Sequence, residues 1–454
     1  MAETIDRLTN ETVELLQALI KNQCVNDGTP ESGHEDRSAR LLRDELESTG
    51  VDLQLFETAP GRSSLVARYE GTDPSAPALC LMGHTDVVPV SPDGWRVDPF
   101  GGELLTDSDG TQEVWGRGAV DMLNLTSSMA VAFREIVQSG KRYPGDVIYF
   151  AVADEEAGGV LGAKQLIENE WDALKCDYLL TEYGGTPMID GDRTIVLLTS
   201  AEKGAGAREI TITGEPGHGS MPFGADNALI KAAEVVRRLS EYNPDPSLEG
   251  LFVGQIKALG LDAATEAKLL DPAHVIDALA ELPPSLAASL HSCCHMSFSP
   301  NRLLSGSKDN VIPDVAKLLV DIRILPGETQ DDVEAHLRTA IGEDLMASVQ
   351  FKTLYPEEGS TASSTDTPLW NALADSILMA YPGAEVMPSM VTGGTDARFF
   401  RRRGVPSYGA GLLSDKIPLG EFMSRFHGHN ERIDVDSLRL TTQLWLDVLD
   451  RLWV

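Results

Sequence analysis

The stretch Leu81–Val90, LMGHTDVVPV, constrains the fold most, because an apolar run ends there in a histidine and an aspartate two residues apart. Side chains two residues apart on an extended strand point to the same side, so His84 and Asp86 would emerge together where the strand meets a loop. Such a pair can be a metal ligand and the carboxylate that orients it. The alternative is a buried histidine that bonds to its neighbour for structural reasons, and only further ligand-type residues can decide.

Two other apolar segments end in the same way. The run Val147–Val152 leads into the acidic triplet 154–156, and the run CDYLLTEYGG at 176–185 leads into Glu182. Adjacent carboxylates at a strand exit repel one another unless cations are near. Because ligand crevices form at the carboxyl ends of strands in open α/β sheets, these segments favour one shared site.

The pattern of apolar residues predicts an α/β protein with a second domain inserted into the first. Helical spacing is found at 2–22, 36–48, 125–137, 368–381 and 435–454, with short apolar strands between them, as in a mostly parallel sheet flanked by helices. From about Glu202 a strand, helix, strand, helix, strand order indicates a smaller α/β domain. We predict a main domain at 1–201 and 355–454 and an insertion at 202–354; the passage Asn243–Asn301 is too weakly patterned to assign.

Composition excludes some classes of partner. The chain has 454 residues and a formal net charge of −33, from 70 acidic and 37 basic residues, which argues against binding to nucleic acid or to an anionic membrane. The five cysteines show no CxxC spacing, which suggests a reducing compartment. No basic start precedes an apolar run, and no apolar stretch approaches the roughly 18 residues of a membrane span. A cytoplasmic protein is expected.

The ligand-type residues together favour a two-metal site. Five candidates lie at strand ends or in loops: His84, Asp121, Glu156, Glu182 and His427. Two imidazoles with several carboxylates suit Zn²⁺, with Co²⁺ or Mn²⁺ as substitutes, and five ligands are more than one zinc ion requires. Glu155, beside a ligand, is our candidate general base, which would take a proton from the attacking water and pass it to the leaving nitrogen. Asp86 would bond the far nitrogen of His84 and fix its tautomer.

The motifs that hold these residues resemble the M20 metallopeptidase and deacylase family along nearly the whole chain. In order they are GHTDVVP at 83–89, WGRGAVDM at 115–122, DEEAGG at 154–159, TEYGG at 181–185, GEPGHGSMPFGADNA at 214–228, NVIPDVAKLLVDIR at 310–323, GGTDARFF at 393–400 and HGHNERI at 427–433. The resemblance implies a zinc-peptidase-like catalytic domain, and an inserted ferredoxin-like domain that serves as a lid and for dimerisation. It also sorts the ligands: His84, Asp121 and Glu182 on one ion, and Asp121, Glu156 and His427 on the other.

The resemblance assigns further roles. It implies that His218, in the GHGS loop, reaches the active site of a partner subunit in a homodimer and stabilises the oxyanion. The residues at positions that bind substrate in the family are Asn310, Arg323, Gly394, Thr395 and Arg398. Arginine suits a carboxylate because its planar fork pairs with both oxygens. The Asp121–Met122 peptide is expected to be cis, and His427 is favoured over His429 as the ligand. The chain departs from the family where Leu123 replaces a common lysine.

The predicted function is a dinuclear zinc-dependent hydrolase that cleaves an amide bond in a small substrate with a free carboxylate. The substrate is a dipeptide, a C-terminal residue or an N-acyl amino acid, and GHTDVVP resembles the desuccinylase and deacetylase branch. The alternative from another class is a catalytically inactive, dimeric binding protein of the same family. That alternative predicts the loss of a ligand or of the general base, whereas the sequence retains all of them.

Overall fold

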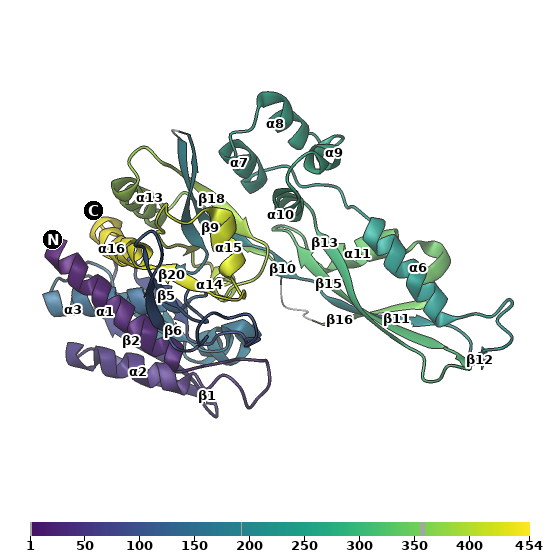
Figure 1. Cartoon of the computed structure of the whole chain (residues 1–454), viewed down its shortest axis with the longest axis horizontal. Coiled ribbons are helices and arrows are strands. Elements are labelled where there is room, and N and C mark those ends of the chain that lie inside the picture. Colours follow the sequence, from purple (N-terminus) through teal and green to yellow (C-terminus); the bar gives the residue numbers. More distant parts are fainter. Residues whose placement is uncertain (1, 192, 355–358) are drawn as a thin grey trace. The chain divides into compact units, whose positions relative to one another are not determined.

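The computed structural model describes residues 2–191, 193–354 and 359–454, which form two compact units (Figure 1). The first unit comprises Met1–Ser200, Ser363–Pro388 and Thr395–Val454, and the second comprises Ala201–Ala362 and Ser389–Gly394. The boundaries predicted from the sequence, with an insertion at 202–354, stay a prediction. Residues 355–358, at the second of these boundaries, lie outside the described residues.

In the described part of the chain, the larger sheet is mixed and has ten strands. Its order is β1 (Asp52–Ala59), β2 (Arg62–Tyr69), β6 (Val147–Val152), β3 (Leu79–His84), β7 (Tyr178–Thr181), β19 (Ser407–Gly409), β9 (Arg193–Glu202) and β17 (Thr361–Ala362), while β8 (Gly184–Asp190) and β18 (Glu385–Val391) pair with β9. The central strands β6, β3, β7 and β19 run parallel, and the strands at both edges are antiparallel. The α/β class predicted from the sequence is confirmed.

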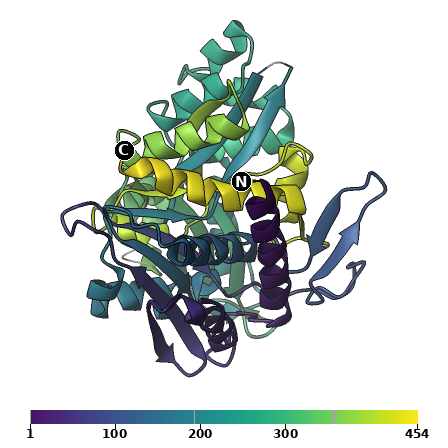
Figure 2. The ribbon, with the colours of Figure 1, turned by 90° about the vertical axis from the view of Figure 1, so that its left-hand side faces the viewer.

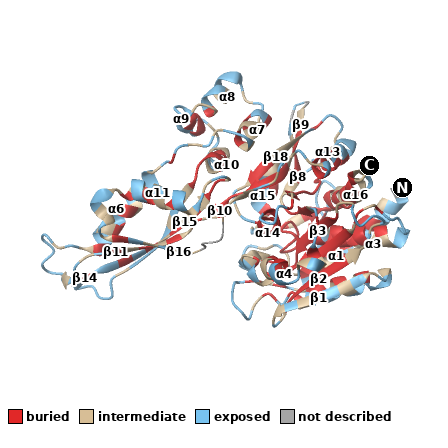
Figure 3. Cartoon of the chain, turned by 180° about the vertical axis from the view of Figure 1, so that it is seen from behind, coloured by how far each residue is buried: buried red, intermediate tan, exposed pale blue. Residues whose placement is uncertain are grey.

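Helices cover both faces of this sheet, and its central strands β3 and β6 are buried throughout (Figure 3). Leu79 and Leu81 of β3 pack on one side with α1 (Ala2–Lys21), α2 (Asp36–Leu46), α3 (Leu123–Ser139), α13 (Pro368–Ala380) and α16 (Val435–Leu452). Cys80 and Met82 pack on the other side with α4 (Gln165–Asn169), α5 (Trp171–Leu174) and α14 (Ala397–Arg401). A strand buried on both faces has no polar alternation, which explains why these strands are continuous apolar runs.

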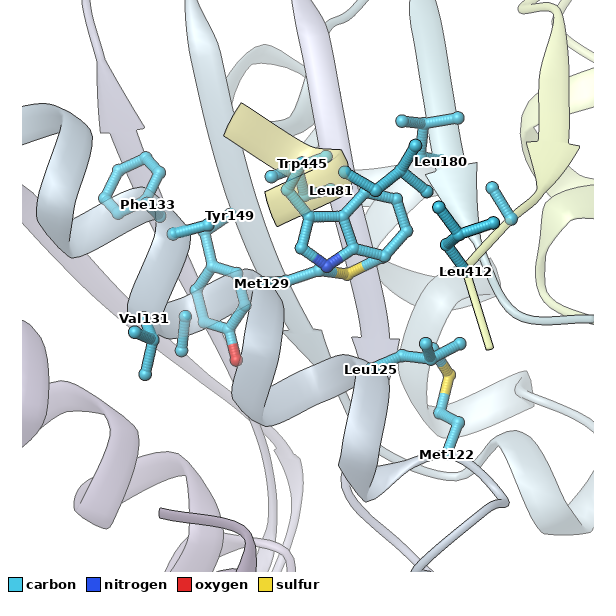
Figure 4. Packing of buried hydrophobic residues seen from close by; sticks show 14 of the residues in the cluster. Leu81, Met122, Leu125, Met129, Val131, Phe133, Tyr149, Leu180, Leu412 and Trp445 are labelled. Atoms are coloured by element: carbon cyan, nitrogen blue, oxygen red, sulfur yellow. The ribbon is translucent and has the colours of Figure 1, made fainter. Parts of the chain in front are cut away.

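The terminal helix helps to hold the helix that follows Asp121. Trp445 of α16 lies among Leu81, Met129 and Leu412 (Figure 4), and its indole N–H donates to Ser128 Oγ on α3 at 2.9 Å. α1 lies against both α3 and α16, so the first and last helices of the chain pack together (Figure 2). α3 is therefore packed against the helices from both ends of the chain.

A small sheet brings two distant loops together. It has the order β20 (Arg432–Asp434), β5 (Gln112–Trp115) and β4 (Glu103–Thr106), and Arg432 is opposite Trp115. The loop before β20, which follows α15 (Leu419–Arg425), therefore lies beside the segment that leads from β5 to α3. Our reading of the sequence did not predict this sheet.

The second unit is built on an antiparallel sheet. Its order is β10 (Gly204–Ala205), β15 (Val315–Ile324), β11 (Arg208–Thr213) and β16 (Val349–Thr353), with β13 (Ser297–Ser305) also on β15 and a separate ribbon of β12 (Gly217–His218) and β14 (Val311–Ile312). Alternate residues of β15 are buried under α6 (Ala228–Glu241) and α11 (Gln330–Ile341), with α12 (Glu343–Met346) beside them.

The unassigned passage 243–301 contains four short helices with a core of their own. They are α7 (Leu251–Ala258), α8 (Ala263–Leu269), α9 (Val275–Ala280) and α10 (Pro284–Cys294). The first three have eight residues or fewer, which is too short for a clear apolar period. Among the described residues, no helix is both long and apolar enough to cross a bilayer.

Candidate metal centre

Neighbouring parallel strands deliver ligand-type side chains at one edge of the large sheet. His84 ends β3, and the strands that pair with β3 on either side, β6 and β7, run on into Glu155 and Glu182. Because parallel strands place their carboxyl ends together, these side chains converge. The three strand exits that the sequence predicts to share a site are brought together.

Asp121 and His427 complete the cluster from the loops that the small sheet joins. Asp121 precedes α3, and the Asp121–Met122 peptide bond is cis, as the family resemblance implied. His427 follows α15 with a φ of 56°. His429, the other candidate at this motif, lies beside Gly94 instead.

Asp121 lies between the two imidazoles. Its Oδ1 is 3.3 Å from His84 Nε2, and its Oδ2 is 3.1 Å from His427 Nε2. Glu182 Oε2 is 3.7 Å from His84 Nε2, and Glu156 Oε2 is 3.4 Å from His427 Nε2. Two triads of ligand-type side chains therefore share one carboxylate, each triad having one histidine and one glutamate of its own.

Burial and mutual repulsion perturb the ionisation of these groups. Burial, which outweighs the hydrogen bond to His84, raises the pKa of Glu182 to about 8. Burial and the charge of Glu182 raise the pKa of Glu155 well above its usual value. Burial opposes ionisation of Asp121, yet hydrogen bonds to His427 and His84 hold its pKa below the usual value. A cluster of this kind favours the binding of cations.

The residues fit bound metal ions. In the described part of the chain, the two histidines are the only basic side chains that pair with Asp121, Glu156 and Glu182. Glu156 Oε1 is buried and has no hydrogen-bond partner there, as expected of an oxygen that binds a metal ion. Groups of His84 with Asp121 and Glu156, and of His84 with Glu155 and Glu182, each have ligand atoms within 4.8 Å of one another. Nitrogen and oxygen donors of this kind suit zinc.

Comparison with known proteins decides the family. A model of peptidase family M20/M25/M40 matches residues 80–451. The chain belongs to this family. It is therefore a metal-dependent hydrolase of amide bonds, and the predictions of family and enzyme class are confirmed.

The M20 relatives include both deacylases and peptidases. The N-fatty-acyl-amino acid synthase/hydrolase PM20D1 of Xenopus tropicalis is 27% identical over 404 residues, covering 86% of this chain and 75% of that protein. Aminoacylase-1 of Mus musculus is 25% identical over 416 residues, covering 91% and 89%. The crystal structure of the M20 family metallo-carboxypeptidase Sso-CP2 from Sulfolobus solfataricus has a TM-score of 0.72 at 18% identity, covering 97% of this chain and 99% of that one.

Asp86 does not orient His84 with its carboxylate, which corrects the sequence-based expectation. His84 Nδ1 lies 2.9 Å from the main-chain oxygen of Asp86 and 3.7 Å from Oδ1. The carboxylate instead accepts the backbone N–H groups of Glu155 at 3.2 Å and Glu156 at 3.1 Å, and the Nδ2 of Asn26 at 2.8 Å. The reason is that β3 ends at His84, so the side chain of Asp86 does not lie on the same face of a strand as that of His84. Asp86 holds the turn η2 (Glu155–Ala157) in place.

A buried pair that the sequence analysis missed holds Asp121. The carboxylate of Glu431, fully buried, accepts the N–H groups of Val120 at 2.8 Å and Asp121 at 3.2 Å. Arg117 donates to Glu431 at 2.6 Å and to the His427 carbonyl at 3.3 Å. Glu431 stands in the HGHNERI motif, but nothing in that motif indicates its contact with Asp121.

Asp396 is a second buried acidic residue that the sequence pattern did not indicate. It is buried in the GGTDARFF motif, and neither carboxylate oxygen has a hydrogen-bond partner among the described residues. Burial raises its pKa to about 7. It lies against Gly159, where an added Cβ would be 2.0 Å from Oδ1, so only glycine fits at that position.

The residues predicted to bind substrate divide between the two units. Thr395 and Arg398 lie in the first, and both are buried. Arg398 Nη2 donates to the Gly158 carbonyl at 2.7 Å, so its guanidinium supports the turn after Glu156. Gly394 falls in the second unit and is exposed. The roles of these residues in substrate binding stay predictions.

His218, Asn310 and Arg323 lie in the second unit. The β12–β14 ribbon brings His218 near Asn310, whose carbonyl accepts the Gly219 N–H at 2.8 Å. Arg323 pairs through Nε and Nη2 with Asp321, at 2.8 and 3.1 Å, and both line a hollow of about 280 Å³ on the sheet. An anion bound there would compete with Asp321 for the guanidinium.

Zinc binding is expected to release protons near neutral pH. The pKa of Glu182 is raised to about 8, chiefly by burial, and that of His427 to about 10, chiefly by its hydrogen bond to Asp121, so both hold a proton at pH 7. His84 is protonated as well, because its hydrogen bonds to Asp121 and Glu182 outweigh the effect of burial and raise its pKa well above the usual value. Metal ligands must lose these protons, so we expect release of about three protons per chain and an affinity that rises with pH. Calorimetry of zinc binding in buffers with different heats of ionisation measures the number of protons released. A binding heat independent of the buffer contradicts the assignment.

Proposed function

We propose that the chain is a dinuclear zinc-dependent hydrolase that cleaves an amide bond in a small substrate bearing a free carboxylate. The observation that carries the proposal is Asp121, whose two oxygens face one imidazole each at 3.3 and 3.1 Å. His84 and Glu182 would hold one ion and Glu156 and His427 the other, with Asp121 shared. Co²⁺ or Mn²⁺ could substitute, because the same donor types suit them. Bound there, the two ions would acidify the attacking water and polarise the scissile carbonyl.

Glu155 is the proposed general base and acid. Its carboxylate is held close to His84 and Glu182, and its backbone is fixed by the Asp86 carboxylate. A Glu155 oxygen takes the proton of the attacking water and then delivers it to the leaving nitrogen. Burial and the charge of Glu182 raise its pKa above the usual value, which makes it a stronger base than an exposed carboxylate.

His218 is the proposed donor to the oxyanion, supplied by the partner subunit of a homodimer. The Ser220 N–H donates to His218 Nδ1 at 3.2 Å, so in the neutral ring Nε2 carries the proton and can donate it. Large apolar side chains of the same unit, Met221, Phe223 and Ile230, are exposed in the single chain. Exposed apolar patches are typical of interfaces, which supports a dimer through this unit.

The two substrate classes are N-acyl amino acids and dipeptides or C-terminal residues. Two relatives, an aminoacylase and an N-fatty-acyl-amino acid synthase/hydrolase, favour the first class, and the carboxypeptidase favours the second. Both classes carry a free carboxylate, for which Arg323 and Asn310 are the proposed partners. The cytoplasm is the proposed compartment, supported by five cysteines that are all free and buried.

The experiment that tests the function is hydrolysis of a substrate panel by the zinc-loaded chain. The panel contains N-acetyl, N-succinyl and long-chain N-acyl amino acids, unblocked dipeptides, and each compound as its carboxamide. We expect one class to turn over and its carboxamide to be cleaved poorly. Equal cleavage of acid and carboxamide contradicts carboxylate recognition. If the chain binds two zinc ions but cleaves none of the compounds, the result favours the alternative of a catalytically inactive binding protein.

Changing His218 to alanine is expected to lower kcat roughly 10²- to 10³-fold, the usual cost of an oxyanion donor. His274→Ala, at an exposed histidine of the same unit, is the control. Mixing His218→Ala chains with Glu155→Gln chains tests donation between subunits, because a mixed dimer contains one site with both groups intact. Recovery of activity on mixing supports the proposal. An unchanged kcat in His218→Ala contradicts it.

A further inference from the structure

Arg62 is a buried cation that the proposed mechanism does not use. It is the first residue of β2 and only 2% exposed. Its Nε and Nη2 each donate to one carboxylate oxygen of Glu35 at 2.7 Å, and Nη2 also donates to Asp154 Oδ1 at 2.7 Å. Glu35 is fully buried. Buried ion pairs of this kind add little to the stability of the fold, because the cost of desolvation offsets their attraction. Stability alone therefore does not account for Arg62.

The partners of Arg62 hold the turn that carries Glu155 and Glu156. The Asp154 N–H donates to Glu35 Oε1 at 3.2 Å, and Asp154 Oδ2 accepts the Leu161 N–H at 2.7 Å. Asp154 has a φ of 74°, a left-handed conformation that a non-glycine residue keeps only when its surroundings impose it. The next two N–H groups of the turn donate to Asp86. Three consecutive amides are thus fixed by two buried carboxylates.

We propose that Arg62 is a positioning residue, which by holding Glu35 and Asp154 together sets the turn that presents Glu155 and Glu156 to the metal centre. The inference rests on the proposed function, in which these two glutamates are base and ligand. Arginine suits the task because its planar fork bonds both oxygens of one carboxylate and still reaches a second. The loop before α2 closes on the guanidinium, since a Cβ at Gly33 would lie 2.5 Å from Arg62 Nε.

The test compares Arg62→Lys with wild type in three measurements. Lysine keeps the charge but not the fork, so the turn should loosen. We expect kcat to fall about 10- to 100-fold with KM little changed, and zinc affinity to fall by a similar factor, the usual range for residues that orient ligands. Hydrogen exchange of the amides of 154–156 should become faster. A residue that only stabilises the fold would change the melting temperature without these local effects.

Arg68→Lys is the matched control, because Arg68 lies on the same strand and also pairs with a carboxylate, Asp146. It should leave all three measurements unchanged. If Arg62→Lys does not fold, Glu35→Gln, which keeps the side-chain shape, takes its place with the same expectations. Arg62→Lys with wild-type kcat, zinc affinity and exchange overturns the inference. Zinc affinity and exchange need no substrate, so they test Arg62 even where the panel shows the proposed function to be wrong.

Discussion

Replacing Glu155 by glutamine is expected to lower kcat roughly 10²- to 10⁴-fold while two zinc ions remain bound, because the amide cannot accept and return a proton. The side chain keeps its size, and the N–H of residue 155 can still donate to Asp86, so the turn should be preserved. Steady-state kinetics on the cleaved substrate class, with metal content measured on the same sample, checks both parts of the expectation.

The same variant separates two roles for Glu155. Its carboxylate is near enough to His84 and Glu182 to be a metal ligand. If it is one, replacing it should lower the number of bound zinc ions. Loss of zinc from Glu155→Gln would therefore assign Glu155 to the metal and leave the base unidentified. Glu168→Gln, at an exposed glutamate on α4, is the control for a change of charge alone and should behave as wild type.

His84, Glu156 and Glu182 could be predicted as candidate ligands from the sequence because each stands at or just after the end of a strand with a clear apolar pattern. The strands before His84, Asp154 and Glu182 are buried on both faces, so their apolar runs stand out and mark where the chain leaves the sheet. The order of those strands then brings the exits together. Sorting the ligands into two triads needed the family resemblance, and the positions of Asp121 between the two imidazoles are consistent with that sorting.

The residues that hold the ligands could not be predicted, because their roles depend on contacts that no local pattern encodes. Arg62 and Glu35 are single charged residues, and nothing in the sequence around them indicates that both are buried. Glu431 reaches the Asp121 amide across 310 residues, and only the pairing of β20 with β5 brings them together. The assumption that Asp86 shares a face with His84 was wrong because it required the strand to continue past residue 84.

Replacing Asp121 by asparagine is expected to have the second large effect, the loss of one zinc ion and of nearly all hydrolysis. Each Asp121 oxygen faces a different imidazole, and asparagine keeps one oxygen but puts a nitrogen that cannot ligate in place of the other. Zinc content should fall from two ions to about one per chain. Because a second metal ion contributes several kcal/mol to the transition state, kcat should fall roughly 10³-fold or more.

Metal analysis and calorimetry on Asp121→Asn measure the stoichiometry directly. The control is Asp177→Asn, since Asp177 accepts a backbone N–H, that of Ala78, at 2.8 Å and lies before β7, at the other end of the strand from Glu182. That variant should keep two ions. Asp121→Asn that binds two ions with wild-type affinity would show that Asp121 is not shared between them. In that case the two imidazoles and the glutamates would have to hold both ions. Glu155, whose carboxylate is grouped with His84 and Glu182, would become the replacement ligand.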